Sequence, residues 1–441
     1  MTPTPTSGVG AIGARPRDGG PTGARPSGPV VPGPSPDAAA STAGASPWVM
    51  STYFAEGLPY SIVHQISSQF FTAMGASLQA IGLTSLYGLA WNLKFVWSPI
   101  VDRYSTTRRW LVGTQLAIAL VVFAIAWPAS LGDQGAVARM MVALAFLAAT
   151  HDIAIDGYYL RTLGTRQQTA LSGMRIASYR VALLVGNGVL VWLAGRTSWF
   201  WCFMAAGGLM LLLTIAHALF LPAERSPNAG QDPGAPASAP VKDSRTRITP
   251  ALFTSFFDRP RIAPTLGFIL TFRAGDAMMF AMSAPLLKDL GMGTAERGVV
   301  SGIGTAASIA GSILGSAIIT RYTLRRALVP IALVQSLAIP LYVLLAWARP
   351  GPLGIGAVVV AEQLVAGVGT AAFLVFLVRR SAGEYKVSHF AIASALMSVA
   401  TTAAGSVSGY LASLVGFTAL FAIAFVASIP GVILARSVPT E

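Results

Sequence analysis

Long apolar segments recur along this chain, and they strongly limit what it can fold into. A helix needs about 20 apolar residues to cross a bilayer, and twelve segments meet that requirement. Hydrophobic residues make up 54% of the sequence and charged residues only 11%, against about 25% charged in soluble domains. The chain is therefore predicted to be an all-α membrane protein with twelve transmembrane helices, at residues 48–72, 78–99, 110–130, 137–159, 168–194, 199–221, 262–287, 297–319, 327–347, 353–378, 388–413 and 416–435.

The positive charges follow the order of these spans. If the N-terminus is placed inside, the inside loops hold seventeen Lys and Arg residues and the outside loops hold five. Cytoplasmic loops of membrane proteins carry such an excess, so both termini are predicted to be cytoplasmic. Topology thus explains the net charge of +13, and no nucleic-acid partner is expected.

The polar stretches divide the chain. Residues 1–47 are rich in Pro, Gly, Ala and Ser and predict a disordered cytoplasmic tail. Residues 222–258 predict a cytoplasmic linker. The linker separates two predicted six-helix bundles, residues 48–221 and residues 259–436.

The two bundles repeat short motifs at a common offset. Arg103-Tyr104 recurs as Arg321-Tyr322, and Phe54 recurs as Phe272, each 218 residues later. Duplicated helical units are typical of transporters, in which the solute site lies between the units near the bilayer midplane. The sequence therefore predicts two pseudo-symmetric bundles around a central site.

Ionisable residues inside the spans indicate that site, because a charge at the bilayer centre costs about 2.5–3.5 kcal/mol. Every carboxylate inside the membrane lies on the first, fourth, seventh or tenth span. The proton-coupling candidates are Asp152, Asp156, Glu56 and Glu362. The substrate-binding candidates are Arg175, Arg180, Tyr60, His64 and Asp276.

Helical spacing groups several of these residues. Glu56, Tyr60 and His64 are four residues apart and form one stripe on the first span. Asp152 and Asp156 share a face of the fourth span. Two carboxylates held close together suit proton transfer, and the alternative is permanent ion pairing with Lys94 or Arg175.

Two further expectations concern residues inside or beside the spans. Arg273 and Asp276 are three residues apart and are predicted to pair within the seventh span. Six tryptophans lie toward predicted span ends, where tryptophans commonly anchor a helix at the membrane interface: Trp91, Trp97, Trp110, Trp127, Trp192 and Trp199.

Enzyme signatures are absent from the sequence. It contains no G-x-x-x-x-G-K-[ST] phosphate loop and no H-E-x-x-H or G-x-S-x-G motif. Its single cysteine, Cys202, excludes an internal disulfide, and no zinc-binding spacing is present. No enzymatic activity, metal or cofactor is expected.

The second and fourth spans carry the most specific runs. Lys94-Phe95-Val96-Trp97-Ser98-Pro99 leads into Asp102-Arg103, and Asp152-Ile153-Ala154-Ile155-Asp156 lies in the fourth span. With Glu56-Gly57-Leu58-Pro59, these runs resemble the AmpG family of muropeptide permeases, over roughly residues 50–435 of this chain. This branch of the major facilitator fold also holds acetyl-CoA transporters and some siderophore transporters.

The resemblance implies proton-driven import of anhydro-muropeptides across the bacterial inner membrane. It also implies a monomer and a cytoplasmic gate motif formed by Asp102, Arg103, Arg108 and Arg109. A siderophore or other organic anion is the alternative cargo, since cationic residues suit any such solute. A drug exporter is a further alternative, but the fifth span reads Gly186-Asn187-Gly188 without the proline usual in exporters.

Overall fold

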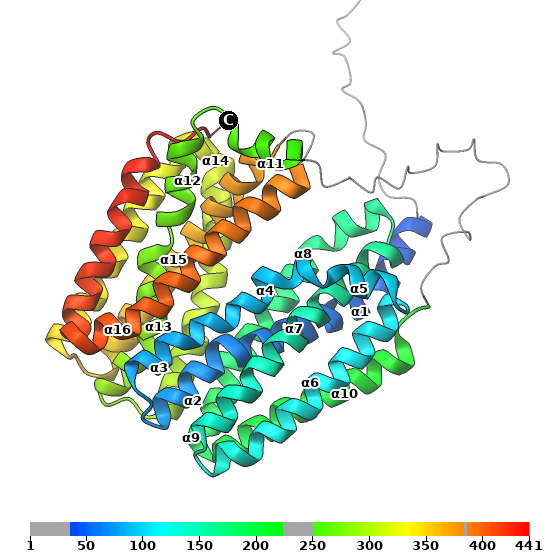
Figure 1. The fold of residues 1–441 in the computed structure, drawn as a ribbon, viewed down its shortest axis with the longest axis horizontal. Helices are drawn as coiled ribbons and strands as arrows, with labels where there is room; N and C mark the ends of the chain where they lie inside the picture. The colour runs from blue at the N-terminus through cyan, green and yellow to red at the C-terminus, as the bar shows by residue number, and fades with distance from the viewer. Residues whose placement is uncertain (1–35, 224–249, 383–385, 441) are drawn as a thin grey trace, which may run out of the picture. The chain divides into compact units, whose positions relative to one another are not determined.

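The computed structural model of this chain describes residues 36–223, 250–382 and 386–440, and all regular structure in these ranges is helical (Figure 1). The predicted tail at residues 1–35 and most of the predicted linker lie outside the described residues. Residues 42–441 form one compact unit. Within that unit, we call residues 42–223 the N-terminal half and residues 250–440 the C-terminal half.

The N-terminal half contains α-helices interrupted by short π-helical and 3-10 segments. The segments are α1 (Pro36–Ser61), η1 (Ile62–Ile66), α2 (Ser67–Ala73), α3 (Leu78–Leu83), η2 (Thr84–Gly88), α4 (Leu89–Leu93), η3 (Lys94–Val96), α5 (Ser98–Arg103), α6 (Thr107–Ser130), α7 (Gln134–Thr162), α8 (Thr165–Leu184), η4 (Val185–Leu190), α9 (Val191–Arg196) and α10 (Trp199–Phe220).

The C-terminal half has fewer and longer segments. They are α11 (Pro250–Phe257), α12 (Ile262–Thr271), α13 (Ala274–Asp289), α14 (Thr294–Ala348), α15 (Pro352–Arg380) and α16 (Lys386–Leu434). Two of them bend at one residue with positive φ: α14 at Thr323 (φ 65°) and α16 at Gly416 (φ 76°). Thr323 falls between two predicted spans and Gly416 is the first residue of the last one, so each of these helices covers two spans.

Helix boundaries agree with the predicted spans except at two places. α1 begins at Pro36, so the last residues of the predicted tail are helical. α11 lies inside the predicted linker. Short caps define several other ends; for example, Asp133 accepts a 2.9 Å hydrogen bond from the amide of Ala136 at the start of α7.

Seven helices in the described ranges are long and apolar enough to cross a membrane. They are Thr107–Ser130, Gln134–Thr162, Ala170–Arg196, Trp199–Phe220, Thr294–Ala348, Pro352–Arg380 and Ser388–Leu434. The other predicted spans consist of shorter consecutive segments, such as α12 and α13. A total of twelve crossings therefore stays a prediction.

The hydrophobic core is continuous between the two halves at one end of the helices only. The largest cluster joins residues such as Phe70 and Ala129 with Leu286 and Phe421. We call this the shared-core end; the chain turns there at residues 74–77, 131–133 and 290–293. At the opposite end each half has its own cluster, and we call it the split-core end.

Glycines bring the halves together at the shared-core end. A Cβ on Gly82 of α3 would lie 2.9 Å from the Cα of Gly409 on α16, and one on Gly188 of η4 would lie 2.9 Å from the Cα of Gly302 on α14. Figure 1 shows α3 beside α16 at this end. Lys288 adds a 2.6 Å hydrogen bond to the carbonyl of Thr72. Small residues permit such close backbone contact inside a membrane.

Candidate functional site

The polar stripe of the first span lies where the helix changes its winding. Glu56 and Tyr60 lie on α1, and His64 lies in the π-helical segment η1. Segments of this kind occur frequently at functional sites. All three side chains are half-buried, whereas the neighbouring Leu58, Ile62 and Val63 belong to the core.

The two acids of α7 each meet a cation from another segment. Lys94 of η3 forms an ion pair with Asp152. Arg175 of α8 lies 3.3 Å from Asp156, which also accepts a 2.8 Å hydrogen bond from the hydroxyl of Tyr53. The sequence left open whether these two acids transfer a proton or form ion pairs with Lys94 and Arg175. In the structure both acids form these ion pairs.

Glu56 differs from these acids because no cation in the described ranges forms an ion pair with it. Its Oε2 atom is buried without a hydrogen-bond partner. The carboxyl group of Asp152 lies within electrostatic reach of Glu56, but Asp152 is the acid that Lys94 pairs with. Glu56 is therefore the acid of this group without an ion pair among the described residues.

Two tyrosines that the sequence analysis did not select surround Arg175. Its guanidinium carbon lies 4.6 Å from the ring centre of Tyr53 and 5.5 Å from that of Tyr159. A guanidinium over an aromatic face is favourable. Spacing is the signal that was available: Tyr53 precedes Glu56 by three residues, and Tyr159 follows Asp156 by three.

Aromatic rings gather around Tyr60. The ring of His64 stacks on it at 4.1 Å between centroids, Trp91 meets it edge-on at 5.2 Å, and Tyr179 lies 5.9 Å away. Trp91 also contacts His64 at 5.0 Å. The Trp91 side chain of α4 therefore faces α1, and its predicted role as an interfacial anchor stays a prediction. We call Tyr60, His64, Trp91 and Tyr179 the ring cluster.

The C-terminal half contributes a second polar group next to a break in the seventh span. α12 ends at Thr271 and α13 begins at Ala274, which leaves Arg273 with non-helical φ and ψ angles of −106° and 2°. Arg273 donates a 2.6 Å hydrogen bond to Thr370, and Asp276 accepts one from Gln335. The predicted pair between Arg273 and Asp276 is absent among the described contacts.

Glu362 of α15 is 2% exposed. Its one described hydrogen bond comes from the side-chain amide of Gln363 at 2.9 Å. Arg273 and Asp276 are within electrostatic reach of its carboxyl group. Glu362 is thus a buried acid that forms no ion pair with a described cation. It remains a candidate for proton transfer.

Arg180 has no ion pair or hydrogen bond with the described residues, although it directly follows Tyr179 of the ring cluster. It lies within electrostatic reach of Arg273 from the other half, and Arg273 is within reach of Tyr60. Two arginines without carboxylate partners thus lie near the ring cluster, and they are available to an anionic ligand.

The gate-motif residues lie at the split-core end. Asp102 and Arg103 are in α5, and only the backbone of Asp102 is described. Arg108 donates a 2.7 Å hydrogen bond to the carbonyl of Ala218. Arg103 and Arg109 are exposed. The motif therefore contacts the end of α10 through Arg108.

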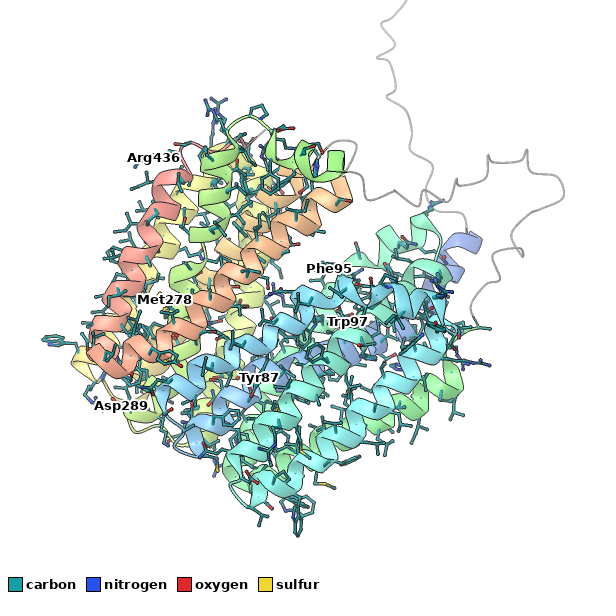
Figure 2. All side chains as sticks on the ribbon, in the orientation of Figure 1. Tyr87, Phe95, Trp97, Met278, Asp289 and Arg436 are labelled. Carbon is teal, nitrogen blue, oxygen red and sulfur yellow. The ribbon has the colours of Figure 1, made fainter. Side chains whose placement is uncertain are left out.

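Two other polar features lie outside this site. Trp97, labelled in Figure 2, donates a 3.1 Å hydrogen bond to Thr150. Asp289, also labelled, forms a 2.8 Å ion pair with Arg349 at the shared-core end. The described residues contain no group of three His, Cys, Asp or Glu side chains suited to a metal ion.

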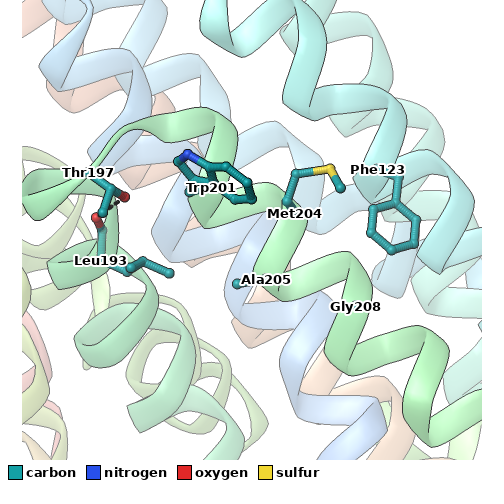
Figure 3. A pocket seen from close by; sticks show the side chains of 7 residues that line it. All are labelled: Phe123, Leu193, Thr197, Trp201, Met204, Ala205 and Gly208. Atoms are coloured by element: carbon teal, nitrogen blue, oxygen red, sulfur yellow. Dashed lines mark hydrogen bonds between the residues drawn. The ribbon is translucent and has the colours of Figure 1, made fainter.

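A separate hollow of about 530 Å³ lies among α6, α9 and α10. Figure 3 shows its lining, which includes Phe123, Leu193, Trp201 and Met204. Its polar side chain, Thr197, is bonded to the carbonyl of Leu193 at 2.8 Å. Since no ionisable group lines it, this hollow suits apolar matter such as a lipid chain, and it is distinct from the candidate site.

Apolar helices with ionisable groups between them are typical of a multi-pass membrane transporter for a small-molecule substrate. The Major Facilitator Superfamily profile matches residues 47–388, and this chain belongs to that superfamily. The predicted all-helical major facilitator fold is confirmed, while the count of twelve spans stays a prediction.

Three proteins are similar to this chain over most of its length. The chain is similar to the anhydromuropeptide permease of Escherichia coli K12, with 28% identity over 389 residues, which is 86% of this chain and 77% of the relative. An uncharacterised Haemophilus influenzae protein is 27% identical, covering 87% and 91%. The putative transporter AmpG 4 of Rickettsia felis is 21% identical, covering 85% and 91%. The AmpG-type resemblance is confirmed.

Solved structures support the fold alone. The D-xylose–proton symporter superposes with a TM-score of 0.69 at 11% identity, covering 90% of this chain and 98% of its own. The nucleoside transporter NupG superposes with a TM-score of 0.64 at 16% identity, covering 90% and 97%.

Proposed function

We propose that this protein is a proton-coupled importer that carries anhydro-muropeptide-like solutes across the bacterial inner membrane by alternating access. The observation that carries the proposal is the buried Glu56 carboxyl oxygen, which has no hydrogen-bond partner and no ion pair among the described residues, inside spans that also hold the Lys94–Asp152 ion pair. The similarity to the anhydromuropeptide permease of Escherichia coli supports the substrate class.

Glu56 is the proton carrier in this proposal. Asp152 and Asp156 are held by Lys94 and Arg175, so losing charge at either acid would leave a cation uncompensated. Glu56 has no such cation and can gain or lose a proton at lower cost. Glu362 is the corresponding candidate in the C-terminal half.

The substrate anion binds Arg180 in this proposal, with Arg273 and Asp276 opposite. Arg175 is already neutralised by Asp156 and held between two tyrosine rings; it positions that acid. Arg180 keeps its donors free of described partners, and a guanidinium matches the planar carboxylates of a peptide.

Alternating access follows from the two ends of the core. The halves share a core at one end and have separate cores at the other. With both termini cytoplasmic, the shared-core end faces the periplasm, and the structure corresponds to an inward-facing state. Asp102, Arg103, Arg108 and Arg109 then form the cytoplasmic gate of a monomer with bundles at 48–221 and 259–436.

A siderophore or other organic anion is the second candidate cargo, because unpaired arginines would bind it equally well. Drug export is less favoured: the helix break in the fifth span at Val185–Leu190 is π-helical and contains no proline.

The test is uptake of labelled anhydro-muropeptide into vesicles with an imposed pH gradient. We expect accumulation that depends on the gradient. Glu56→Gln should abolish it while sparing exchange of internal for external substrate, because exchange needs no net proton movement.

Asp258→Asn is the matched carboxyl control, since Asp258 follows α11 outside the spans. If folded wild-type protein takes up no muropeptide, the proposed substrate is wrong. Normal accumulation by Glu56→Gln would overturn its role as the proton carrier.

A further inference from the structure

The ring cluster is assembled from three parts of the N-terminal half. Tyr60 and His64 come from the first span, Trp91 from α4 and Tyr179 from α8. The centroid distances of 4.1 to 5.9 Å place these rings in mutual contact. Such contacts fix the rings in place, so they form a rigid surface and not a set of independent side chains.

Exposure separates this cluster from the core rings of the same protein. Phe70 and Phe203, which also pack edge to face, are fully buried. All members of the ring cluster are only half-buried. Part of each of these residues therefore remains accessible, within membrane spans that also carry arginines and acids.

A glycine lets the ring cluster approach the C-terminal half closely. A Cβ on Gly88 would lie 3.4 Å from His64 Nε2 and 3.3 Å from Thr402 Oγ1 of α16. Arg180, which has no ion pair or hydrogen bond with the described residues, lies within electrostatic reach of Tyr179. A cation therefore lies near the ring cluster.

We infer that the ring cluster is the saccharide subsite of the transporter, on which a pyranose ring of the substrate stacks while Arg180 binds a carboxylate of the attached peptide. The inference rests on the proposed function. A pyranose presents a face of C–H groups that packs on the electron-rich face of an aromatic ring. Its hydroxyl groups project sideways, where Tyr60 and Tyr179 supply hydroxyl partners.

The test separates sugar recognition from peptide recognition. Uptake of labelled anhydro-muropeptide is competed with two unlabelled probes: the anhydro-disaccharide without peptide, and the peptide without sugar. Trp91→Leu removes the aromatic ring and keeps apolar volume. We expect it to weaken competition by the disaccharide about tenfold and to leave competition by the peptide within about twofold.

Matched variants complete the design. Trp127→Leu changes a tryptophan that is 68% exposed on α6 and should alter neither competitor. Trp91→Phe keeps a smaller ring and should retain most of the disaccharide affinity. If Trp91→Leu fails to fold by size-exclusion chromatography, Tyr60→Leu is measured in its place.

The outcomes distinguish the two proposals. Equal loss for both competitors, or no loss for the disaccharide, overturns the saccharide subsite while leaving muropeptide import intact. Wild-type protein that transports no muropeptide overturns both. A loss confined to the disaccharide supports the assignment of the ring cluster.

Discussion

Tyr53 donates a 2.8 Å hydrogen bond to Asp156, the same carboxylate that Arg175 approaches at 3.3 Å. The ring of Tyr53 also lies against the guanidinium of Arg175. One side chain thus holds both members of an ion pair, and it links the first, fourth and fifth predicted spans near the split-core end.

Tyr53→Phe removes the hydroxyl and retains the ring. We expect a loss of about 1.5–3 kcal/mol in stability, the usual contribution of a hydrogen bond to a charged group. A lower melting temperature in detergent measures it. Tyr87→Phe is the control, because the Tyr87 hydroxyl bonds no residue that the structure describes. An unchanged melting temperature for Tyr53→Phe contradicts the prediction.

The Lys94–Asp152 ion pair predicts coupled effects of substitution. Asp152→Asn leaves Lys94 uncompensated and should destabilise the protein by about 1–3 kcal/mol. The cost is below that of a fully buried pair because the Lys94 side chain is 35% exposed. Adding Lys94→Gln should recover part of this stability. A double variant as unstable as the sum of both single variants would argue against direct coupling.

A substitution at Gly82 tests whether close contact at the shared-core end is needed for transport. Gly82→Val places carbon atoms where α3 meets Gly409 of α16, with the first only 2.9 Å from the Cα of Gly409. This end should then close poorly and uptake should fall strongly. Gly113→Val is the control, since a Cβ there meets no atom within 4 Å.

Cross-linking reports that closure directly. Gln79 donates a 2.7 Å hydrogen bond to Ser413 across the same contact. The pair Gln79→Cys and Ser413→Cys should therefore be joined by a short bifunctional thiol reagent, and Gly82→Val should lower the yield of this cross-link. An undiminished yield would show that α3 and α16 still meet.

A substitution at Asp102 should change the rate of transport more than substrate binding. If the gate motif controls opening, Asp102→Asn should lower kcat about tenfold and change KM by less than about twofold. Initial rates of muropeptide uptake over a range of concentrations measure both constants. Asp258→Asn again serves as the carboxyl control, and a selective rise in KM would contradict the gate assignment.

The sequence alone determined the helices and the faces that carry charge. Apolar length sets where a membrane helix can form, and four-residue spacing set the stripe of Glu56, Tyr60 and His64 as well as the face of Asp152 and Asp156. These features depend only on local helix geometry, so a single sequence is enough to predict them.

Only the tertiary structure decided which partner each charge takes. Lys94 is 58 residues from Asp152, and spacing within one helix contains no information about that distance. The expected pair of Arg273 and Asp276 does not form because Arg273 donates to Thr370 of α15 and Asp276 accepts from Gln335 of α14. Both partners come from other helices. Trp91 joins the ring cluster for a similar reason: its direction depends on how α4 packs against α1, and side-chain packing between distant segments decides that.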